Sequence, residues 1–473
     1  MTGGLRTIDP ATNPHLSGRF APVDREVDQG DLPVDGALPT DLTGVYLRNG
    51  PNPRFPPLGS YTYPMEGDGM LHGVWLENGR ARYRNRWVYT NGLRADLRAG
   101  RALFGGLMTP AAPDPSRLGP DPDPGWPFKL DAFINIVQHA GRYLALEEGT
   151  PPYEVTATLD TIGRFDFGGR LPAGMCAHPR VDPETGEMVV FRYDVEAPFL
   201  SWATIGPDGE VTRPATTVDT VDECFMIHDF AITRRYAVLV VAPVIIDVAA
   251  MGTDCQPLRW EPDRPTRIAV IDRDGTSPTR WIETDPFFVW HYSNAYERGS
   301  DIIVDFPWWS AFTLSQSPGA PARGGFARAR LEPDRGACHV ELLDDIASEF
   351  PRIDDRRVAQ PHRYVTTSRD SGRHELLVGE FDQLARHDMH TGATETYDAD
   401  VMFGEVVFAP RDGATEELDG YYLTYATSAD AQRSWLLVWD ATTFPSEPLA
   451  RVRTPRRVPH GLHGNWFPPE RPG

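Results

Sequence analysis

The chain has very little lysine and cysteine. One lysine, Lys129, stands among 46 basic residues, and the 67 acidic residues bring the formal net charge to −21. Such a surplus of negative charge argues against a nucleic-acid partner. The four cysteines form no CxxC pair, which argues against a zinc knuckle and against a disulfide framework. This cysteine pattern fits a reducing cytoplasm.

Long apolar runs are also missing. The most apolar stretch, Ala237–Met251, is too short to cross a bilayer and is interrupted by Pro243 and Asp247. The first six residues lack the apolar segment of a signal peptide. We therefore expect a soluble cytoplasmic protein, although a peripheral membrane contact stays compatible with this sequence.

Turn-forming residues and short strand patterns are abundant. With 43 glycines and 45 prolines in 473 residues, the chain is expected to contain many turns and few long helices. The strongest hairpin signal is His72–Thr90, where Asn78-Gly79 joins two alternating runs. Further strand candidates are Gly141–Glu148, Gly186–Val195, Ala231–Val241, Asp301–Phe306 and Tyr421–Thr427.

Many short strands without helical periodicity favour a sandwich, a barrel or a propeller. No fixed-period repeat stands out. A propeller holds this length most easily in one domain, so we predict a single all-β domain over residues 1–473, which includes an extended N-terminal arm of about residues 1–40. The Pro-rich stretches Leu107–Trp126 and Ser315–Gly325 are predicted to be loops over one face, and Leu342–Phe350 a short helix or turn.

Four histidines share a similar context. His463 lies in Gly461-Leu-His-Gly464, where glycine lets the backbone pass close to another group, and His178, His228 and His291 each open a strand-like apolar run. A lone histidine usually binds no metal. Four in matching contexts, far apart in the chain, suit metal ligands delivered from separate blades to a central axis. Imidazole ligands are compatible with iron, zinc, copper or nickel.

Three glutamates are candidates for hydrogen-bonding the outer ring nitrogens of such histidine ligands. Neutral imidazoles leave the charge of a metal uncompensated, so acidic partners are expected on their outer ring nitrogens. Glu148, Glu349 and Glu405 each stand beside apolar neighbours, where an unpaired charge is costly. Taken alone, these residues are explained equally well as solvent-exposed strand ends.

Six stretches occur in the same order as in the carotenoid cleavage oxygenases, a family that includes apocarotenoid, stilbene and isoeugenol cleavage enzymes and the retinoid isomerase. They are Gly44-Val-Tyr-Leu-Arg-Asn-Gly-Pro-Asn-Pro53, Glu66-Gly-Asp-Gly-Met-Leu-His72, Ala177-His-Pro179, Ile227-His-Asp-Phe230, His291-Tyr-Ser-Asn294 and Gly461-Leu-His-Gly464. The chain resembles this family over about residues 15–467.

The resemblance implies a seven-bladed β-propeller with a dome of loops and short helices over one face. It also implies one non-haem Fe(II) per chain, held by His178, His228, His291 and His463. Glu148, Glu349 and Glu405 match the family's glutamates behind the ligands. The implied reaction adds both atoms of dioxygen across the double bond of an apolar alkene and releases two carbonyl products. Aromatic residues such as Phe288 and Trp290 are candidates for the walls of the substrate tunnel.

Two positions bear on the substrate. Relatives that cleave lignostilbenes or isoeugenol resemble one another in a tyrosine and a lysine that grip the substrate's 4-hydroxyl, and here those positions hold Leu107 and Glu147. A carotenoid or apocarotenoid is therefore the preferred substrate class. A stilbene or phenylpropenoid substrate stays open, as does a propeller that binds or isomerises an apolar ligand without cleaving it. His460 and His72 are expected to be structural.

Overall fold

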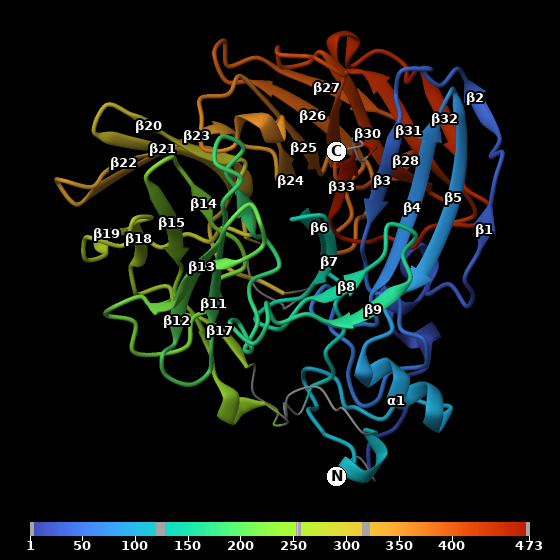
Figure 1. Cartoon of the computed structure of the whole chain (residues 1–473), viewed down its shortest axis with the longest axis horizontal. Helices are drawn as coiled ribbons and strands as arrows, with labels where there is room; N and C mark the ends of the chain where they lie inside the picture. Colours follow the sequence, from blue (N-terminus) through green and yellow to red (C-terminus); the bar gives the residue numbers. More distant parts are fainter. Residues whose placement is uncertain (1–3, 120–127, 252, 254–256, 315–321, 470–473) are drawn as a thin grey trace.

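The computed structural model describes residues 4–119, 128–251, 253, 257–314 and 322–469. Within these residues the chain forms eight antiparallel sheets, seven of which surround a common centre as the blades of a propeller (Figure 1). The predicted all-β propeller is confirmed, and the number of blades is the one that the family resemblance implies. No helix in the described part of the chain is long and apolar enough to cross a membrane.

Five blades are four-stranded and follow one another along the chain. The first two are β6 (Asn135–His139), β7 (Arg142–Leu146), β8 (Tyr153–Val155) and β9 (Thr161–Arg164), then β10 (Arg180–Val181), β11 (Met188–Tyr193), β12 (Leu200–Ile205) and β13 (Val211–Thr217). The third holds β14 (Ala231–Ile232), β15 (Tyr236–Val241), β18 (Thr266–Asp272) and β19 (Arg280–Thr284), with a ribbon of β16 (Val244–Ile246) and β17 (Leu258–Trp260) inserted. The others are β20 (Asn294–Arg298), β21 (Asp301–Trp309), β22 (Gly324–Glu332) and β23 (Ala337–Asp344), then β24 (Ser348–Arg352), β25 (Tyr364–Arg369), β26 (Gln383–Asp388) and β27 (Thr394–Asp398).

The last two blades combine strands from both ends of the chain. One contains β28 (Val401–Phe403), β29 (Val407–Pro410), β30 (Gly420–Ser428), β31 (Ser434–Asp440), β32 (Ala450–Arg453) and β2 (Val34–Gly36). The other contains β33 (Gly464–Phe467), β3 (Gly44–Arg48), β4 (Met70–Glu77), β5 (Arg80–Trp87) and β1 (Asp28–Gln29). The ring is thus closed by pairing of β33 with β3, and the predicted N-terminal arm supplies one outer strand to each of these blades.

The first part of the most apolar stretch of the sequence lies in β15, a central strand buried on both faces. In β15, Ala237, Leu239 and Val241 pack into one core cluster, whereas Tyr236, Val238 and Val240 pack into another. Successive side chains of a strand point to opposite faces, so each face of this blade packs against a different neighbour. A doubly buried strand explains why this run shows no polar alternation.

Two local predictions have opposite outcomes. Asn78 and Gly79 join β4 to β5 with φ values of 50° and 71°, the left-handed conformation that a tight hairpin turn of this type requires, so the predicted hairpin is confirmed. For Leu342–Phe350, predicted as a short helix or turn, the helix is wrong. Leu342 and Leu343 belong to β23 and Phe350 to β24, and only residues 345–347 connect the two strands. The strands are held by pairing with β22 and β25, and this tertiary pairing overrides local periodicity.

Short helical segments occur in the connections between the strands. The single α-helix of the described residues, α1 (Asn91–Ala99), is capped by the Thr90 side chain at its start and ends at Gly100, whose φ is 67°. The 3-10 turns are η1 (Pro10–Thr12), η2 (Pro14–Leu16), η3 (Gly18–Phe20), η4 (Pro115–Arg117), η5 (Val248–Ala250), η6 (Asp355–Arg357) and η7 (Ala441–Thr443). Residues 120–126 and 315–321 of the predicted Pro-rich loops lie outside the described residues, and Gly324 and Gly325, at the end of the second, belong to β22 instead.

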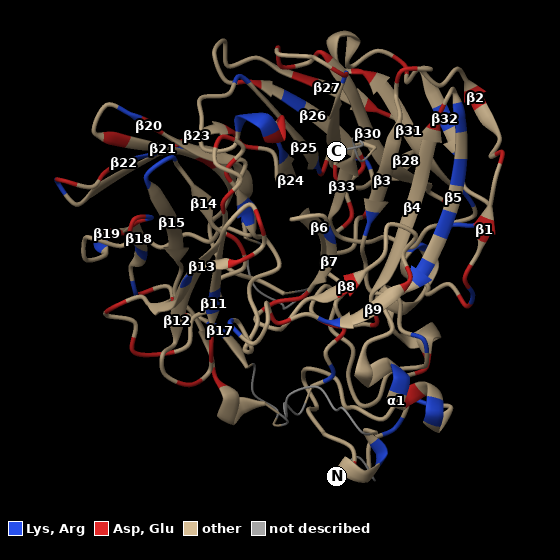
Figure 2. Cartoon of the chain, viewed as in Figure 1, with Lys and Arg blue, Asp and Glu red and all other residues tan. Residues whose placement is uncertain are grey.

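Arginines occupy every second position of β5 and are visible as blue segments of this strand in Figure 2. Each is paired with an acidic residue. Arg82 contacts Asp28, Arg84 contacts Asp160, and Arg86 contacts Glu26. The strand therefore presents alternating charges to solvent and not an uncompensated cationic stripe of the kind that binds a phosphate backbone.

Candidate metal centre

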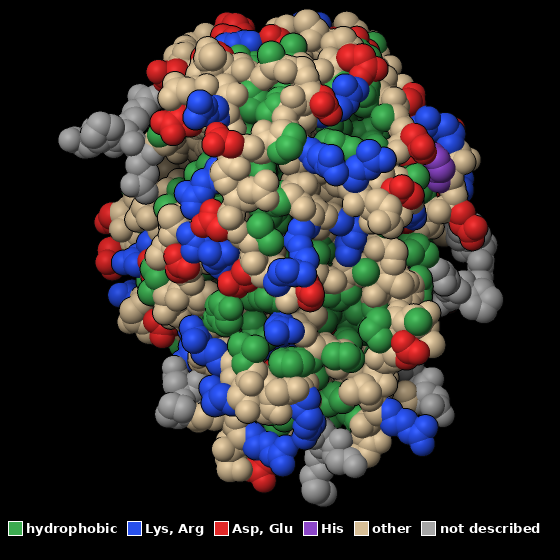
Figure 3. Space-filling model, turned by 90° about the vertical axis from the view of Figure 1, so that its right-hand side faces the viewer, with side chains coloured by type: hydrophobic (Ala, Val, Ile, Leu, Met, Phe, Trp, Pro, Cys, Tyr) green, Lys and Arg blue, Asp and Glu red, His purple; other side chains and the backbone are tan. Residues whose placement is uncertain are grey.

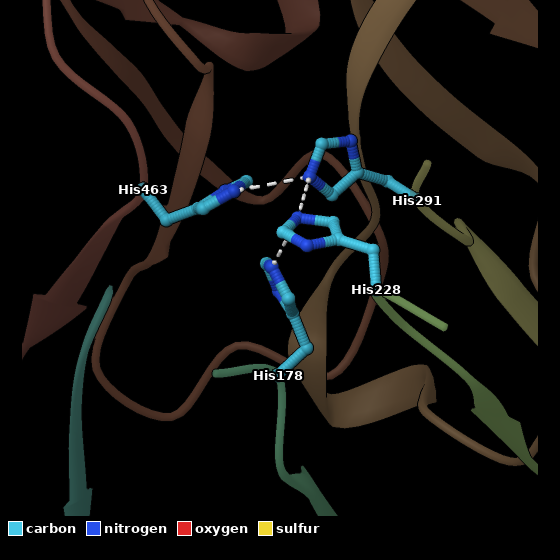
Figure 4. A group of neighbouring side chains, drawn as sticks. All are labelled: His178, His228, His291 and His463. Carbon is cyan, nitrogen blue, oxygen red and sulfur yellow. Dashed lines mark hydrogen bonds between the residues drawn. The ribbon is translucent and has the colours of Figure 1, made fainter. Parts of the chain in front are cut away.

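Each of the four histidines lies just before the first strand of a different blade. His178 precedes β10, His228 precedes β14, and His291 precedes β20. His463 directly precedes β33. Because these strands stand in equivalent places around the ring, the four imidazoles converge at one end of its centre, and Figure 4 shows them pointing toward one another.

The ring nitrogens that face inward are close together. The Nε2 atoms of His178 and His228 are 3.1 Å apart, those of His228 and His291 3.2 Å, and those of His291 and His463 3.1 Å. All four potential ligand atoms lie within 4.8 Å of one another. Two imidazole nitrogens bound to one ion at about 2.1 Å are separated by about 3.0 Å at a right angle and about 3.4 Å at a tetrahedral angle. The observed contacts fall in this range.

Three carboxylates hold the outward-facing nitrogens. Nδ1 of His228 contacts Glu148, Nδ1 of His291 lies 2.7 Å from Glu349, and Nδ1 of His463 lies 3.1 Å from Glu405. A carboxylate accepts the Nδ1 proton and thereby leaves Nε2 with its lone pair directed inward. In this arrangement neighbouring Nε2 atoms cannot donate to one another. A cation between them would satisfy their lone pairs.

Burial sets the protonation of the cluster. It lowers the pKa of His178 and of His291 well below 6.5, and the adjacent imidazoles lower both pKa values further. Burial raises the pKa of Glu349 well above its usual range. Burial also opposes ionisation of Glu405, but Arg352 and His463 outweigh it and bring the pKa of Glu405 below its ordinary value. Neutral imidazoles facing inward, with acids behind them, fit a metal ion.

Each carboxylate has a second donor that the sequence did not reveal. The Tyr193 hydroxyl donates to Glu148 at 2.5 Å, the Trp309 indole to Glu349 at 2.5 Å, and Arg352 to Glu405 at 3.2 Å. All three donors are the last residue of a strand, in β11, β21 and β24. This shared position at the end of a strand is the one signal that sequence inspection could have used.

A cavity of about 590 Å³ opens onto the histidines and is lined by His228, His291 and His463. Most of its wall is apolar or aromatic, including Tyr61, Phe104, Phe133, Ile134, Trp290 and Phe350. Of the predicted contact residues, Leu107, Glu147 and Trp290 line the cavity. Phe288 does not. Its ring packs behind Trp290, with ring centroids 4.9 Å apart, so its prediction as a wall residue is corrected to a supporting one.

Glu147 and Leu107 are held by backbone hydrogen bonds. Glu147 Oε2 accepts the N–H groups of Asp131 and Ala132 at 2.6 and 3.0 Å, and the Leu107 N–H donates to Glu66 at 3.0 Å. Other histidines serve the fold: His460 bonds to the carbonyl of Gly379, and His72 Nδ1 lies 2.7 Å from the Tyr83 hydroxyl. Neither belongs to the converging set.

Fold and site together define the class as a β-propeller with a central cluster of four histidines that could hold a metal ion. The chain matches the family model described as RPE65, retinal pigment epithelial membrane protein, over residues 20–468. It is 35% identical to a carotenoid cleavage oxygenase of Mycobacterium tuberculosis, covering 96% of this chain and 98% of that protein. It is 32% identical to an isoeugenol monooxygenase of Pseudomonas nitroreducens, covering 96% and 98%.

The fold is also that of a solved relative. The crystal structure of a lignostilbene dioxygenase from Pseudomonas brassicacearum superposes with a TM-score of 0.88 at 28% identity, over 97% of this chain and 99% of that one. The chain therefore belongs to the carotenoid cleavage oxygenase family. Its enzyme class is that of an alkene-cleaving dioxygenase.

Proposed function

We propose that this protein is a non-haem Fe(II) dioxygenase that cleaves a carbon–carbon double bond of a carotenoid or apocarotenoid. The observation that carries the proposal is the convergence of four Nε2 lone pairs at the end of a largely apolar cavity. In the balanced reaction, R–CH=CH–R′ and O2 give R–CHO and R′–CHO. Both oxygen atoms are consumed, and no external reductant is required.

His178, His228, His291 and His463 would hold the iron through Nε2. When bound, ferrous iron supplies the binding and activation of dioxygen. The three carboxylates keep the Nδ1 protons in place and so fix the tautomer and the orientation of three ligands. The aromatic and aliphatic wall orients the alkene beside the histidines and excludes water.

Leu107 and Glu147 support a polyene over a phenol. Leu107 offers the cavity a hydrocarbon surface and no hydroxyl. Glu147 places a carboxylate where phenol-cleaving relatives resemble one another in a lysine, and like charge disfavours a phenolate there. A stilbene or phenylpropenoid substrate is the second candidate, favoured by the similarity to a lignostilbene dioxygenase and an isoeugenol monooxygenase.

A substrate panel distinguishes these candidates. Iron-loaded protein is incubated in air with apocarotenoids of several lengths, with 4-hydroxystilbene and with isoeugenol, and the products are identified by mass. We expect paired aldehyde products from an apocarotenoid. Cleavage of the phenols alone would favour the second candidate, and binding or isomerisation without cleavage would contradict the proposed reaction.

An apolar substrate also suits delivery from a lipid surface. Figure 3 shows apolar side chains gathered among basic ones on one face of the molecule. On α1, Leu97 is 36% exposed and stands between the exposed Arg94 and Arg98. We expect co-sedimentation with anionic vesicles that Leu97→Glu weakens. Equal recovery of both proteins in the supernatant would contradict a peripheral membrane contact.

A further inference from the structure

Arg352 joins the metal-site carboxylate Glu405 to the backbone beside His463. Its Nη1 donates to Glu405 Oε2 at 3.2 Å and to the carbonyl of Gly464 at 2.8 Å. Its Nη2 donates to the side chain of Asn465 at 3.0 Å. Gly464 N–H in turn donates to Glu405 at 2.9 Å. The guanidinium therefore braces both the carboxylate behind His463 and the two residues that follow this histidine.

A bulge in β24 brings Arg352 to this place. Glu349 and Arg352 are three residues apart, a spacing that puts side chains on opposite faces of a regular strand. Here Glu349 pairs with Ser368 and Arg352 with Thr366, so three steps on β24 match two on β25. Phe350 absorbs the extra residue with φ of 53°, a conformation that phenylalanine rarely adopts. One short strand can thereby serve two neighbouring histidines, His291 through Glu349 and His463 through Arg352.

Arg352 also brings a positive charge next to the centre. Glu148 and Glu349 receive their second hydrogen bonds from the neutral groups of Tyr193 and Trp309. Glu405 instead forms an ion pair with Arg352, whose side chain is 14% exposed. Nη2 of Arg352 also pairs with Asp355 at 3.0 Å, but the Asp355 side chain is 61% exposed, so water screens that second ion pair. The guanidinium therefore places a largely buried positive charge directly beside Glu405.

We propose that Arg352 is a positioning residue of the metal centre, which sets the charge of the site and holds His463 through Glu405 and Gly464. This inference rests on the proposed iron site. It predicts two separable effects. Loss of the positive charge stabilises the ferric over the ferrous state. Loss of the two guanidinium nitrogens that bond to Glu405, Gly464 and Asn465 weakens iron binding without changing the ferric-to-ferrous ratio.

The experiment compares Arg352→Gln, which removes the charge, with Arg352→Lys, which keeps the charge and loses the fork. Arg386→Gln is the matched control. Arg386 is a buried arginine on β26 of the same blade. It donates to the carbonyls of Ala441 and Phe444 and makes no contact with the centre. Ferrous affinity is measured by competition with a chelator, and the ferric-to-ferrous ratio by redox titration.

We expect Arg352→Gln to shift the ferric-to-ferrous ratio at a fixed potential by about tenfold toward ferric, which is about 59 mV for one electron. Arg352→Lys should keep the wild-type ratio and lose about tenfold in ferrous affinity. The control should change neither quantity. If Arg352→Gln cannot be purified in a folded form, Arg352→Lys alone tests the inference. A wild-type ferrous affinity in Arg352→Lys would then overturn it. Wild-type values in both variants would also overturn it, whereas absence of iron binding by the wild-type chain would overturn the proposed function instead.

Discussion

Glu147 and Glu148 are adjacent in the chain but hold different groups. Glu148 accepts the Nδ1 proton of the ligand candidate His228, whereas Glu147 accepts two backbone N–H groups of the cavity wall. Both residues directly follow β7, which ends at Leu146. The pair therefore links the metal centre to the substrate cavity within two residues.

Substrate preference should follow from Glu147 and Leu107. A site built to grip a hydroxyl rejects analogues that lack it by about 10⁴-fold, and this cavity is expected to show no such dependence. We predict a higher kcat/KM for a long apocarotenoid than for 4-hydroxystilbene or isoeugenol, and little gain from adding a 4-hydroxyl to a stilbene.

Leu107→Tyr with Glu147→Lys should shift the preference toward phenols. Leu107→Phe with Glu147→Gln is the control, because it supplies a ring and removes the charge without adding a hydroxyl-gripping pair. A strong preference of the wild-type enzyme for the phenol would contradict the polyene assignment.

Iron content should depend on the converging histidines. His178→Ala and His463→Ala each remove one of the four inward-facing nitrogens, so both variants should lose most of the roughly one iron per chain expected of the wild type. His460→Asn is the control, since His460 lies in the same loop as His463 and bonds to the Gly379 carbonyl instead. Near-full iron occupancy in both alanine variants, measured by elemental analysis, would overturn the ligand assignment.

The carboxylates behind the ligands should tune iron retention. Replacing a carboxylate that orients a ligating histidine typically costs about 10- to 100-fold in metal affinity or activity. Glu349→Gln and Glu405→Gln should therefore release iron faster to a chelator while circular dichroism shows a folded protein. Glu395→Gln, in the outer strand β27, is a suitable comparison. Wild-type iron retention in both site variants would remove these glutamates from the centre.

Acid should destabilise the fold in part through His460. Burial lowers its pKa to about 4, so the unfolded chain binds a proton below pH 6.5 that the folded chain does not. Stability is therefore lost as the pH falls from about 6.5 toward 4, by about 2 kcal/mol from this group between pH 8 and pH 5. His460→Asn should reduce that pH dependence in urea unfolding. An unchanged slope would show that His460 is not buried in its neutral form.

The sequence predicted the fold class and the family, because hairpin turns and ordered motifs are local signals. His178, His228, His291, His463 and the three glutamates could be selected only together with the family resemblance, and the structure brings all seven together. Their metal-binding roles stay a prediction.

The sequence did not predict features that depend on strand register or on packing between distant strands. Arg352 reaches Glu405 only because of the bulge at Phe350, and Phe288 lies behind Trp290 because the two rings pack edge to face. The helix α1 is only nine residues long and has few apolar positions, so its pattern was too weak to recognise.

The fate of dioxygen is the most direct test of the proposed reaction. Iron-loaded protein is supplied with an apocarotenoid under ¹⁸O2, the aldehydes are trapped rapidly as reduced alcohols to limit exchange with water, and their masses are measured. We expect one ¹⁸O atom in each of the two products and loss of turnover in His463→Ala. Label in only one product, or turnover that persists without iron, would contradict a four-histidine alkene-cleaving dioxygenase.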